Sequence, residues 1–127
     1  MYTGYKECNG PFVIRYPRGK GEMADWRNEM RILPIGKGKK LRDGDDIAIL
    51  SLGPIGNEVI KAIKEVESDG ISIAHYDMIF LKPMDEELLH EVGKRFSRVI
   101  TVENGVIKGW TGQCCLELWL ITDMLLR

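Results

Sequence analysis

The sequence predicts an α/β domain with a mainly parallel β-sheet and helices on both faces. Three runs rich in apolar and β-branched residues have the length of buried strands. They are residues 46–53 (DIAILSLG), 70–78 (GISIAHYDM) and 97–104 (SRVITVEN). Segments of helical period separate them, and the order strand, helix, strand, helix, strand favours parallel strands joined by right-handed crossovers.

The chain begins with a segment that we expect to lie outside this domain. Residues 1–5 (MYTGY) have the pattern of a helix end, and Asn9-Gly10-Pro11 predicts a turn. Residues 12–14 (FVI) predict a strand covered on both faces, because the run is apolar without alternation. Residues 21–31 are rich in charged residues and poor in apolar ones. We interpret them as an exposed linker before a second unit, 32–127.

The two predicted helices of the second unit show one apolar face each. Residues 33–46, which precede the first of these helices, predict short strand segments with a turn at 42–45. In the first helix, 54–67, the inward residues are Val59, Ile60, Ile63 and Val66. In the second, 85–96, Asp85 is predicted to cap the helix. The inward residues of the second helix are Leu88, Leu89, Val92 and Phe96.

Composition and charge exclude several classes of protein. The 127 residues are 44% hydrophobic with a net charge of −1, so the chain is able to form a core and has no broad electrostatic preference for nucleic acid or acidic membranes. No apolar run approaches the roughly 20 residues that span a bilayer, and residues 1–10 lack a signal peptide pattern. We therefore expect a cytoplasmic protein without nucleic-acid or membrane partners. Cys8, Cys114 and Cys115 lack CxxC spacing and are expected to be reduced thiols.

Several short motifs have ordinary structural interpretations. GKGKK at 36–40 does not fit the GxxxxGKS/T phosphate loop and is interpreted as a basic hairpin turn. His75 and His90 lack partners at ligand or triad spacing and are interpreted as structural. Residues 85–87 (DEE) are expected to stabilise a helix N-terminus rather than to form an acid–base pair.

The carboxyl ends of the three strands, at Gly53, Asp77 and Glu103, are expected along one sheet edge, where α/β sheets place functional groups. Glu103 either faces a ligand there or is a turn and interface element, and we favour the second interpretation.

RYPRG at 15–19 is the strongest candidate binding motif. A guanidinium group pairs bidentately with phosphate, and a proline stiffens the loop that carries the second arginine. From the residues alone, a phosphate site and a salt-bridged strand end both remain open.

Four stretches carry a resemblance to a known family over residues 1–109, because they occur in the same order and with the same spacing as in that family. They are MYTGY…NGPFVIRYPRG, LPIGKGKKLRDGDDIAILSLG, DMIFLKPMDEELL and RVITVENGVIKG. The sequence resembles the C-terminal part of the 1-deoxy-D-xylulose 5-phosphate synthases, which are transketolase-like enzymes. This resemblance implies a transketolase C-terminal domain in 32–127. Residues 1–20 would be the last helix and strand of a pyrimidine-binding domain.

The family condenses pyruvate with glyceraldehyde 3-phosphate and releases CO2, for isoprenoid, thiamine and pyridoxal synthesis. It uses thiamine diphosphate and magnesium, and its subunits form homodimers. The resemblance implies that Arg18 binds the phosphate of glyceraldehyde 3-phosphate, whereas it gives no role to Arg15 and Tyr16. The family's catalytic glutamate, its cofactor and metal motif and its substrate histidines do not occur in this sequence. We therefore expect that the chain alone binds no cofactor, is inactive, and needs the N-terminal domains as partners.

Other readings remain open. The chain would also fit the C-terminal domain of a transketolase or of a 2-oxoacid dehydrogenase β-subunit, or a non-catalytic α/β interaction module. RYPRG together with LKPMDEELL favours the synthase.

The sequence departs from the family in two places. Ile79 stands where many members have arginine. After Gly109 the family reads G-G-x-G-S-A-V, whereas this chain has WTGQCC. When the codons for WTGQCC are read in a frame shifted by one base, they can encode the family pattern. We therefore hypothesise that residues 110–127 are translated from a shifted frame. As written, they contain an apolar segment of helical length, 116–126, that is expected either to cover the sheet or to be exposed.

Overall fold

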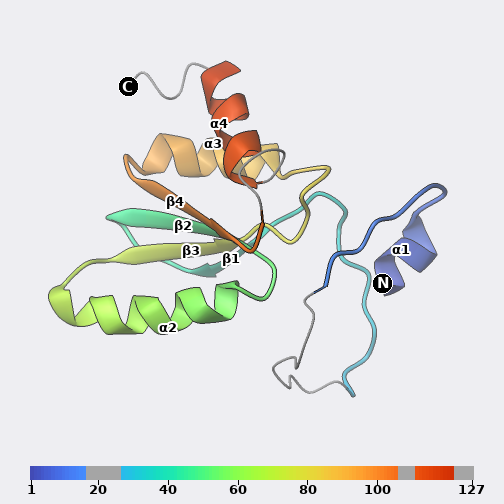
Figure 1. Ribbon diagram of the computed structural model, residues 1–127, viewed down its shortest axis with the longest axis horizontal. Helices are drawn as coiled ribbons and strands as arrows, with labels where there is room; N and C mark the ends of the chain where they lie inside the picture. The colour runs from blue at the N-terminus through green and yellow to red at the C-terminus, as the bar shows by residue number, and fades with distance from the viewer. Residues whose placement is uncertain (17–26, 106–110, 122–127) are drawn as a thin grey trace. The chain divides into compact units, whose positions relative to one another are not determined.

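The computed structural model describes residues 1–16, 27–105 and 111–121 (Figure 1). The chain divides into two compact units, Met1–Ile35 and Gly36–Arg127.

The described part of the first unit contains one short helix, α1 (Tyr2–Glu7), where the sequence predicts a helix end. The buried hydroxyl of Thr3 on α1 accepts a hydrogen bond from the backbone N–H of Leu33 at 3.0 Å. Gly4 lies against the ring of Phe12, and a Cβ at Gly4 would be 2.4 Å from that ring. A glycine is therefore needed for this close packing.

The strand predicted at Phe12–Ile14 does not form. Residues 11–16 belong to no strand, and Val13 is 92% exposed. A strand needs a neighbour for its backbone N–H and C=O groups and cover for its apolar side chains. The described residues of this unit provide no neighbouring strand. Much of the predicted linker, like Arg18, lies outside the described residues.

The second unit is built on a four-stranded sheet with the order β1-β3-β2-β4 (Figure 1). Its strands are β1 (Lys39–Arg42), β2 (Ile47–Leu52), β3 (Ile73–Asp77) and β4 (Val99–Glu103). β2 is parallel to both β3 and β4, whereas β1 is antiparallel to β3. The predicted mainly parallel sheet and its three apolar strands are therefore confirmed. The basic hairpin predicted at 36–40 is wrong, because Lys39 and Lys40 belong to β1, which pairs with the distant β3.

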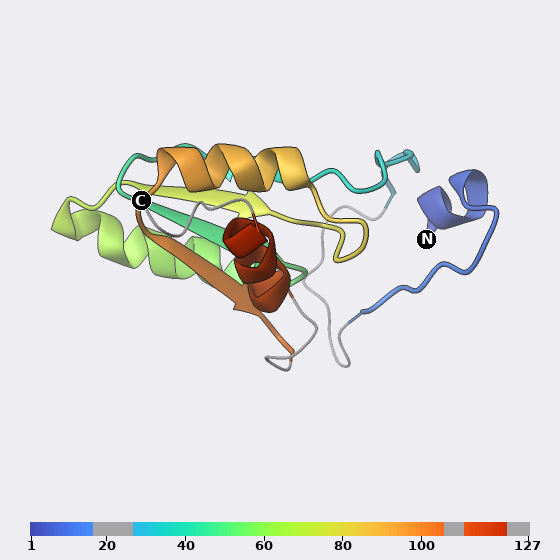
Figure 2. The ribbon, with the colours of Figure 1, turned by 90° about the horizontal axis from the view of Figure 1, so that it is seen from above.

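Helices cover both faces of this sheet, as predicted. One face carries α2 (Gly56–Val66), which continues into the short 3₁₀ helix η1 (Glu67–Asp69). The other face carries α3 (Glu86–Arg95) and α4 (Thr111–Ile121), as Figures 1 and 2 show. Because successive residues of a strand point to opposite faces, each face has its own apolar core.

The two cores confirm most of the inward residues predicted for the helices. Between the sheet and α2, Val59 and Ile63 pack with Ile49 and Ile73. The larger core lies under α3 and α4 and consists of Ala48, Leu50, Ala74, Tyr76, Met78, Leu89, Val92, Phe96, Cys115 and Trp119.

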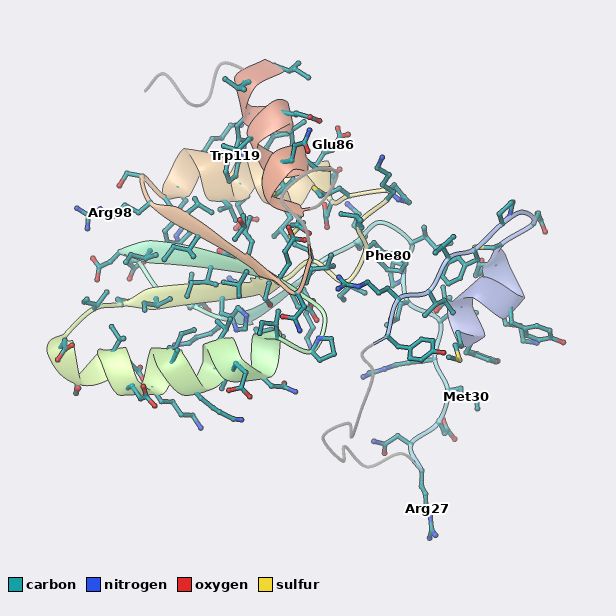
Figure 3. The ribbon with its side chains drawn as sticks, in the orientation of Figure 1. Arg27, Met30, Phe80, Glu86, Arg98 and Trp119 are labelled. Atoms are coloured by element: carbon teal, nitrogen blue, oxygen red, sulfur yellow. The ribbon has the colours of Figure 1, made fainter. Side chains whose placement is uncertain are left out.

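The helix α4 joins the second core through its buried side chains. Cys115 and Trp119 lie one turn apart and are both buried. The indole N–H of Trp119 donates a hydrogen bond to the backbone oxygen of Leu89 on α3 at 3.1 Å (Figure 3). The described part of the apolar tail shows both expected outcomes. Trp119 is buried in this core, whereas Leu116, Leu120 and Ile121 are exposed.

Candidate functional site

The carboxyl ends of the parallel strands meet at one edge of the sheet, as predicted. Ser51 pairs in register with Asp77, and Leu52 pairs with Glu103. Gly53, which has a φ of 82°, directly follows β2. This edge, from here on the carboxyl edge, is where open α/β sheets bind ligands.

A buried pair joins β2 and β3 beside this edge. The Ser51 hydroxyl lies 2.8 Å from Nε2 of His75, and both side chains are buried. Burial lowers the pKa of His75, although the charge of Asp77 acts in the opposite direction. Gly56, the first residue of α2, packs on the pair, because a Cβ there would lie 3.0 Å from the Ser51 hydroxyl. His75 thus has a structural partner, which fits its interpretation as a core residue.

A tight turn follows β3 at the carboxyl edge. The backbone N–H of Phe80 donates to the oxygen of Met78 at 2.5 Å, and the carboxylate of Asp77 accepts from the N–H of Ile79 at 3.1 Å. Ile79, the residue between them, has a φ of 57°. A β-branched residue rarely adopts this left-handed conformation, because its Cβ crowds the backbone. Strained residues of this kind often occur at functional sites.

Asp85 caps α3, as predicted, and also connects α3 to the segment before β1. Its carboxylate accepts hydrogen bonds from the N–H of Leu88 at 3.2 Å and from the N–H of Gly38 at 2.9 Å. Lys37 pairs with Asp85 at 3.5 Å and with Glu87 at 2.5 Å. Burial alone would raise the pKa of Asp85, but these hydrogen bonds and the Lys37 charge outweigh it and lower the pKa.

Glu103 has a structural role at the third strand end. Its carboxylate accepts a hydrogen bond from the backbone N–H of Thr111, the first residue of α4, at 3.2 Å. A carboxylate at this position satisfies a free helix N–H and matches the positive end of the helix dipole. This contact supports its interpretation as a turn element.

The other candidate residues are distributed over the two units. Arg15 and Tyr16 are exposed in the unit Met1–Ile35. His90 is half-buried on α3. The three cysteines are free thiols, as expected. For Cys115, burial raises the pKa to about 12, with smaller contributions from Cys114 and Glu103.

One hollow of the described surface includes His75 of the buried pair in its lining. One cavity of about 200 Å³ is mainly apolar and is lined by Leu41, Arg42, Ile60, Ile63 and His75. Among the described residues, no group of three or more His, Cys, Asp or Glu side chains lies close enough to bind a metal ion. No helix within the described ranges has the length and apolar character needed to cross a membrane.

The sequence did not predict three of these features. The Ser51–His75 pair and the Asp85–Gly38 contact each join residues more than 20 positions apart. No local pattern signals such contacts. The left-handed conformation of Ile79 was also unexpected, although the departure from the family at this position had drawn attention to it.

Comparison with known proteins identifies the domain. Residues 36–120 match the family "Transketolase, C-terminal domain". The 1-deoxy-D-xylulose-5-phosphate synthase of Parabacteroides distasonis is 75% identical to this chain over 117 residues. The synthase of Bacteroides fragilis is 54% identical to it over 118 residues. Each match covers 92% of this chain but 18% of the relative. The chain therefore spans less than a fifth of the length of these relatives.

A solved structure agrees with this assignment. A chain described as a split gene transketolase, in an inactive beta4 tetramer, is 32% identical and superposes with a TM-score of 0.68. The similarity covers 72% of this chain and 30% of that chain. The resemblance to the synthases and the fold expected from it are thus confirmed. The chain belongs to the transketolase C-terminal domain family.

Proposed function

We propose that this chain is the C-terminal part of a 1-deoxy-D-xylulose-5-phosphate synthase, the enzyme that condenses pyruvate with glyceraldehyde 3-phosphate and releases CO2. The observation that carries the proposal is the 75% identity over 117 residues to the synthase of P. distasonis. The motifs RYPRG and LKPMDEELL favour this enzyme over a transketolase or a 2-oxoacid dehydrogenase β-subunit. The product would supply isoprenoid, thiamine and pyridoxal synthesis in the cytoplasm.

In this proposal Arg18 binds the phosphate of glyceraldehyde 3-phosphate. A guanidinium group offers two parallel N–H donors to phosphate oxygens, which fixes both the position and the orientation of the substrate. A charge-assisted hydrogen bond contributes about 1.5–3 kcal/mol. Loss of the Arg18 side chain is therefore expected to weaken glyceraldehyde 3-phosphate binding roughly 10- to 100-fold and to leave pyruvate binding nearly unchanged.

Thiamine diphosphate and magnesium belong to the rest of the synthase in this proposal. The described residues do not fit a magnesium site, since they hold no cluster of candidate ligands. Thiamine diphosphate supplies the carbanion chemistry of such enzymes. We assign its binding to the N-terminal domains, which are the partners of this chain in a homodimeric enzyme. The chain alone is then inactive.

A chimeric enzyme tests the proposal. Residues 1–109 of this chain, over which the resemblance to the synthases extends, replace the corresponding segment of the P. distasonis synthase, and product formation is measured with and without the Arg18→Ala substitution. We expect an active chimera whose KM for glyceraldehyde 3-phosphate rises roughly 10- to 100-fold with Arg18→Ala. Arg31→Ala is the matched control and should leave that KM unchanged, because Arg31 is exposed and outside the RYPRG motif.

An inactive but correctly folded chimera would contradict the assignment to the synthase and favour a non-catalytic module. An active chimera in which Arg18→Ala and Arg31→Ala change the KM for glyceraldehyde 3-phosphate equally would reject the role of Arg18 but keep the assignment to the synthase. Sequencing the gene across codons 105–127 tests the frameshift hypothesis, which an uninterrupted frame without a frame-shifted relative would refute.

A further inference from the structure

The cavity that His75 helps to line lies between the sheet and α2, within the second unit. Its lining comes from β1, β3 and α2, and Figure 1 shows α2 running along this face of the sheet. Leu41 and Ile60 are 42% and 38% exposed and lie at its mouth, whereas Ile63 and His75 are buried. Its volume of about 200 Å³ exceeds the roughly 150 Å³ of a cavity that binds benzene. The cavity therefore has room for a ligand of roughly six to nine non-hydrogen atoms.

A β-bulge in β1 brings two neighbouring residues to this cavity. The pairing of β1 with β3 shifts between Lys40 and Arg42, so Leu41 is an extra residue in the strand. Neighbours in a regular strand point to opposite faces of the sheet. Leu41 and Arg42 nevertheless line the same cavity. Bulges that re-aim side chains in this way often lie beside functional sites.

Arg42 is the one charged residue among the five that line the cavity. Its guanidinium group pairs with the carboxylate of Glu67 on η1. The two side chains are 38% and 42% exposed, and an exposed ion pair contributes at most about 1 kcal/mol. The carboxylate of a ligand can therefore replace that of Glu67. A guanidinium group binds both oxygens of such a carboxylate through two parallel N–H donors.

His75 forms the floor of the cavity. Nε2 of its ring lies 2.8 Å from the Ser51 hydroxyl, and its side chain is buried. Burial lowers the pKa of His75, so the ring is mainly neutral at pH 7 and Arg42 remains the cation of the cavity. The ring also connects the cavity to Ser51 near the carboxyl edge, so it reports on a ligand in the cavity.

We propose that this cavity binds a small carboxylate with an apolar body of about four to six carbons. The carboxylate takes the place of Glu67 at Arg42. The apolar body packs against Leu41, Ile60 and Ile63, which removes its surface from water. The proposed function assigns no ligand to these residues.

Titration of the full chain with 3-methylbutanoate, followed by nuclear magnetic resonance, tests the proposal. We expect shifts of the His75 ring protons and a Kd of about 1 mM, which suits so small a ligand. The uncharged 3-methylbutanol should bind about tenfold more weakly or worse, because it lacks the charge that pairs with Arg42.

Two substitutions should change this affinity in opposite directions. Arg42→Gln should weaken binding about tenfold or more, because it removes the cation. Glu67→Gln should strengthen binding about three- to fivefold, because the competing carboxylate is lost. Arg98→Gln and Glu65→Gln are the matched controls and should leave the Kd unchanged. Both residues are exposed and neither lines this cavity.

The absence of saturable shifts up to about 50 mM ligand would overturn the proposal. Equal affinities for 3-methylbutanoate and 3-methylbutanol would also overturn it, as would equal effects of Arg42→Gln and Arg98→Gln. Circular dichroism checks that each variant is folded. If Arg42→Gln unfolds the chain, Glu67→Gln decides, since tighter binding supports the proposal and unchanged or weaker binding overturns it. The result is independent of the proposed function, which the chimera tests separately.

Discussion

Replacing Asp85 with alanine should remove the hydrogen bond that connects α3 to the segment before β1. Asp85 is almost fully buried, and its two carboxylate oxygens hold the N–H groups of Leu88 and Gly38. Loss of a helix N-cap costs about 1 kcal/mol. A hydrogen bond lost at the half-buried Gly38 costs about 1 kcal/mol more. We expect Asp85→Ala to lower the free energy of unfolding by about 2 kcal/mol, which lowers the Tm by roughly 10 °C.

Urea unfolding of the full chain, followed by circular dichroism, measures this effect. Glu86→Ala is the control, because Glu86 lies in the same first turn of α3 and is exposed (Figure 3). It should cost about 0.5 kcal/mol or less, since only an exposed charge near the helix dipole is lost. Asp85→Asn should fall between the two, because an amide offers one acceptor oxygen for two N–H donors.

The Asp85 carboxylate also predicts that the free energy of unfolding depends on pH. The pKa of Asp85 is lowered in the folded chain, so its carboxylate binds fewer protons there than in the unfolded chain. Its stabilising effect is therefore complete above the unfolded pKa of about 3.9 and is lost as the pH falls through the folded pKa. The difference between wild type and Asp85→Ala should shrink in acid. Equal costs of Asp85→Ala and Glu86→Ala, or a difference independent of pH, would refute the reasoning.

Three further predictions concern buried or strained groups. Tyr76→Phe should leave the free energy of unfolding unchanged or raise it by up to about 1 kcal/mol, since none of the described residues offers the buried Tyr76 hydroxyl a hydrogen bond. A decrease of more than about 1 kcal/mol would reveal a partner. The Ile79→Gly variant should have a free energy of unfolding about 1 kcal/mol higher than Ile79→Ala, because only alanine keeps the Cβ that strains a φ of 57°. A more stable Ile79→Ala variant would contradict this prediction. Iodoacetamide at pH 8 should label Cys115 only after the chain unfolds, because burial raises its pKa to about 12; labelling in the folded chain would show that α4 opens.

Local patterns predicted the parts of the fold whose cause is local. The cap at Asp85 was predictable because its partner, the N–H of Leu88, is three residues away. The strand predicted at Phe12–Ile14 failed for the opposite reason, since an apolar run becomes a strand only where other strands pair with it. For the candidate site, the sequence predicted which strand ends share an edge, whereas the phosphate-binding role of Arg18 came from a resemblance and remains a proposal.

The sequence by itself determined the α/β class, the parallel direction of the three apolar strands, the buried faces of α2 and α3 and the family. Side-chain periodicity and the handedness of crossovers decide the class, the strand direction and the buried helix faces within short stretches of chain. The family followed from the resemblance of four motifs. Only the tertiary structure decided that β1 pairs antiparallel with β3, that Ser51 meets His75, that Ile79 is left-handed and that β4 lies at an outer edge. Each of these depends on which distant segments become neighbours, and a residue's own sequence context does not contain that information.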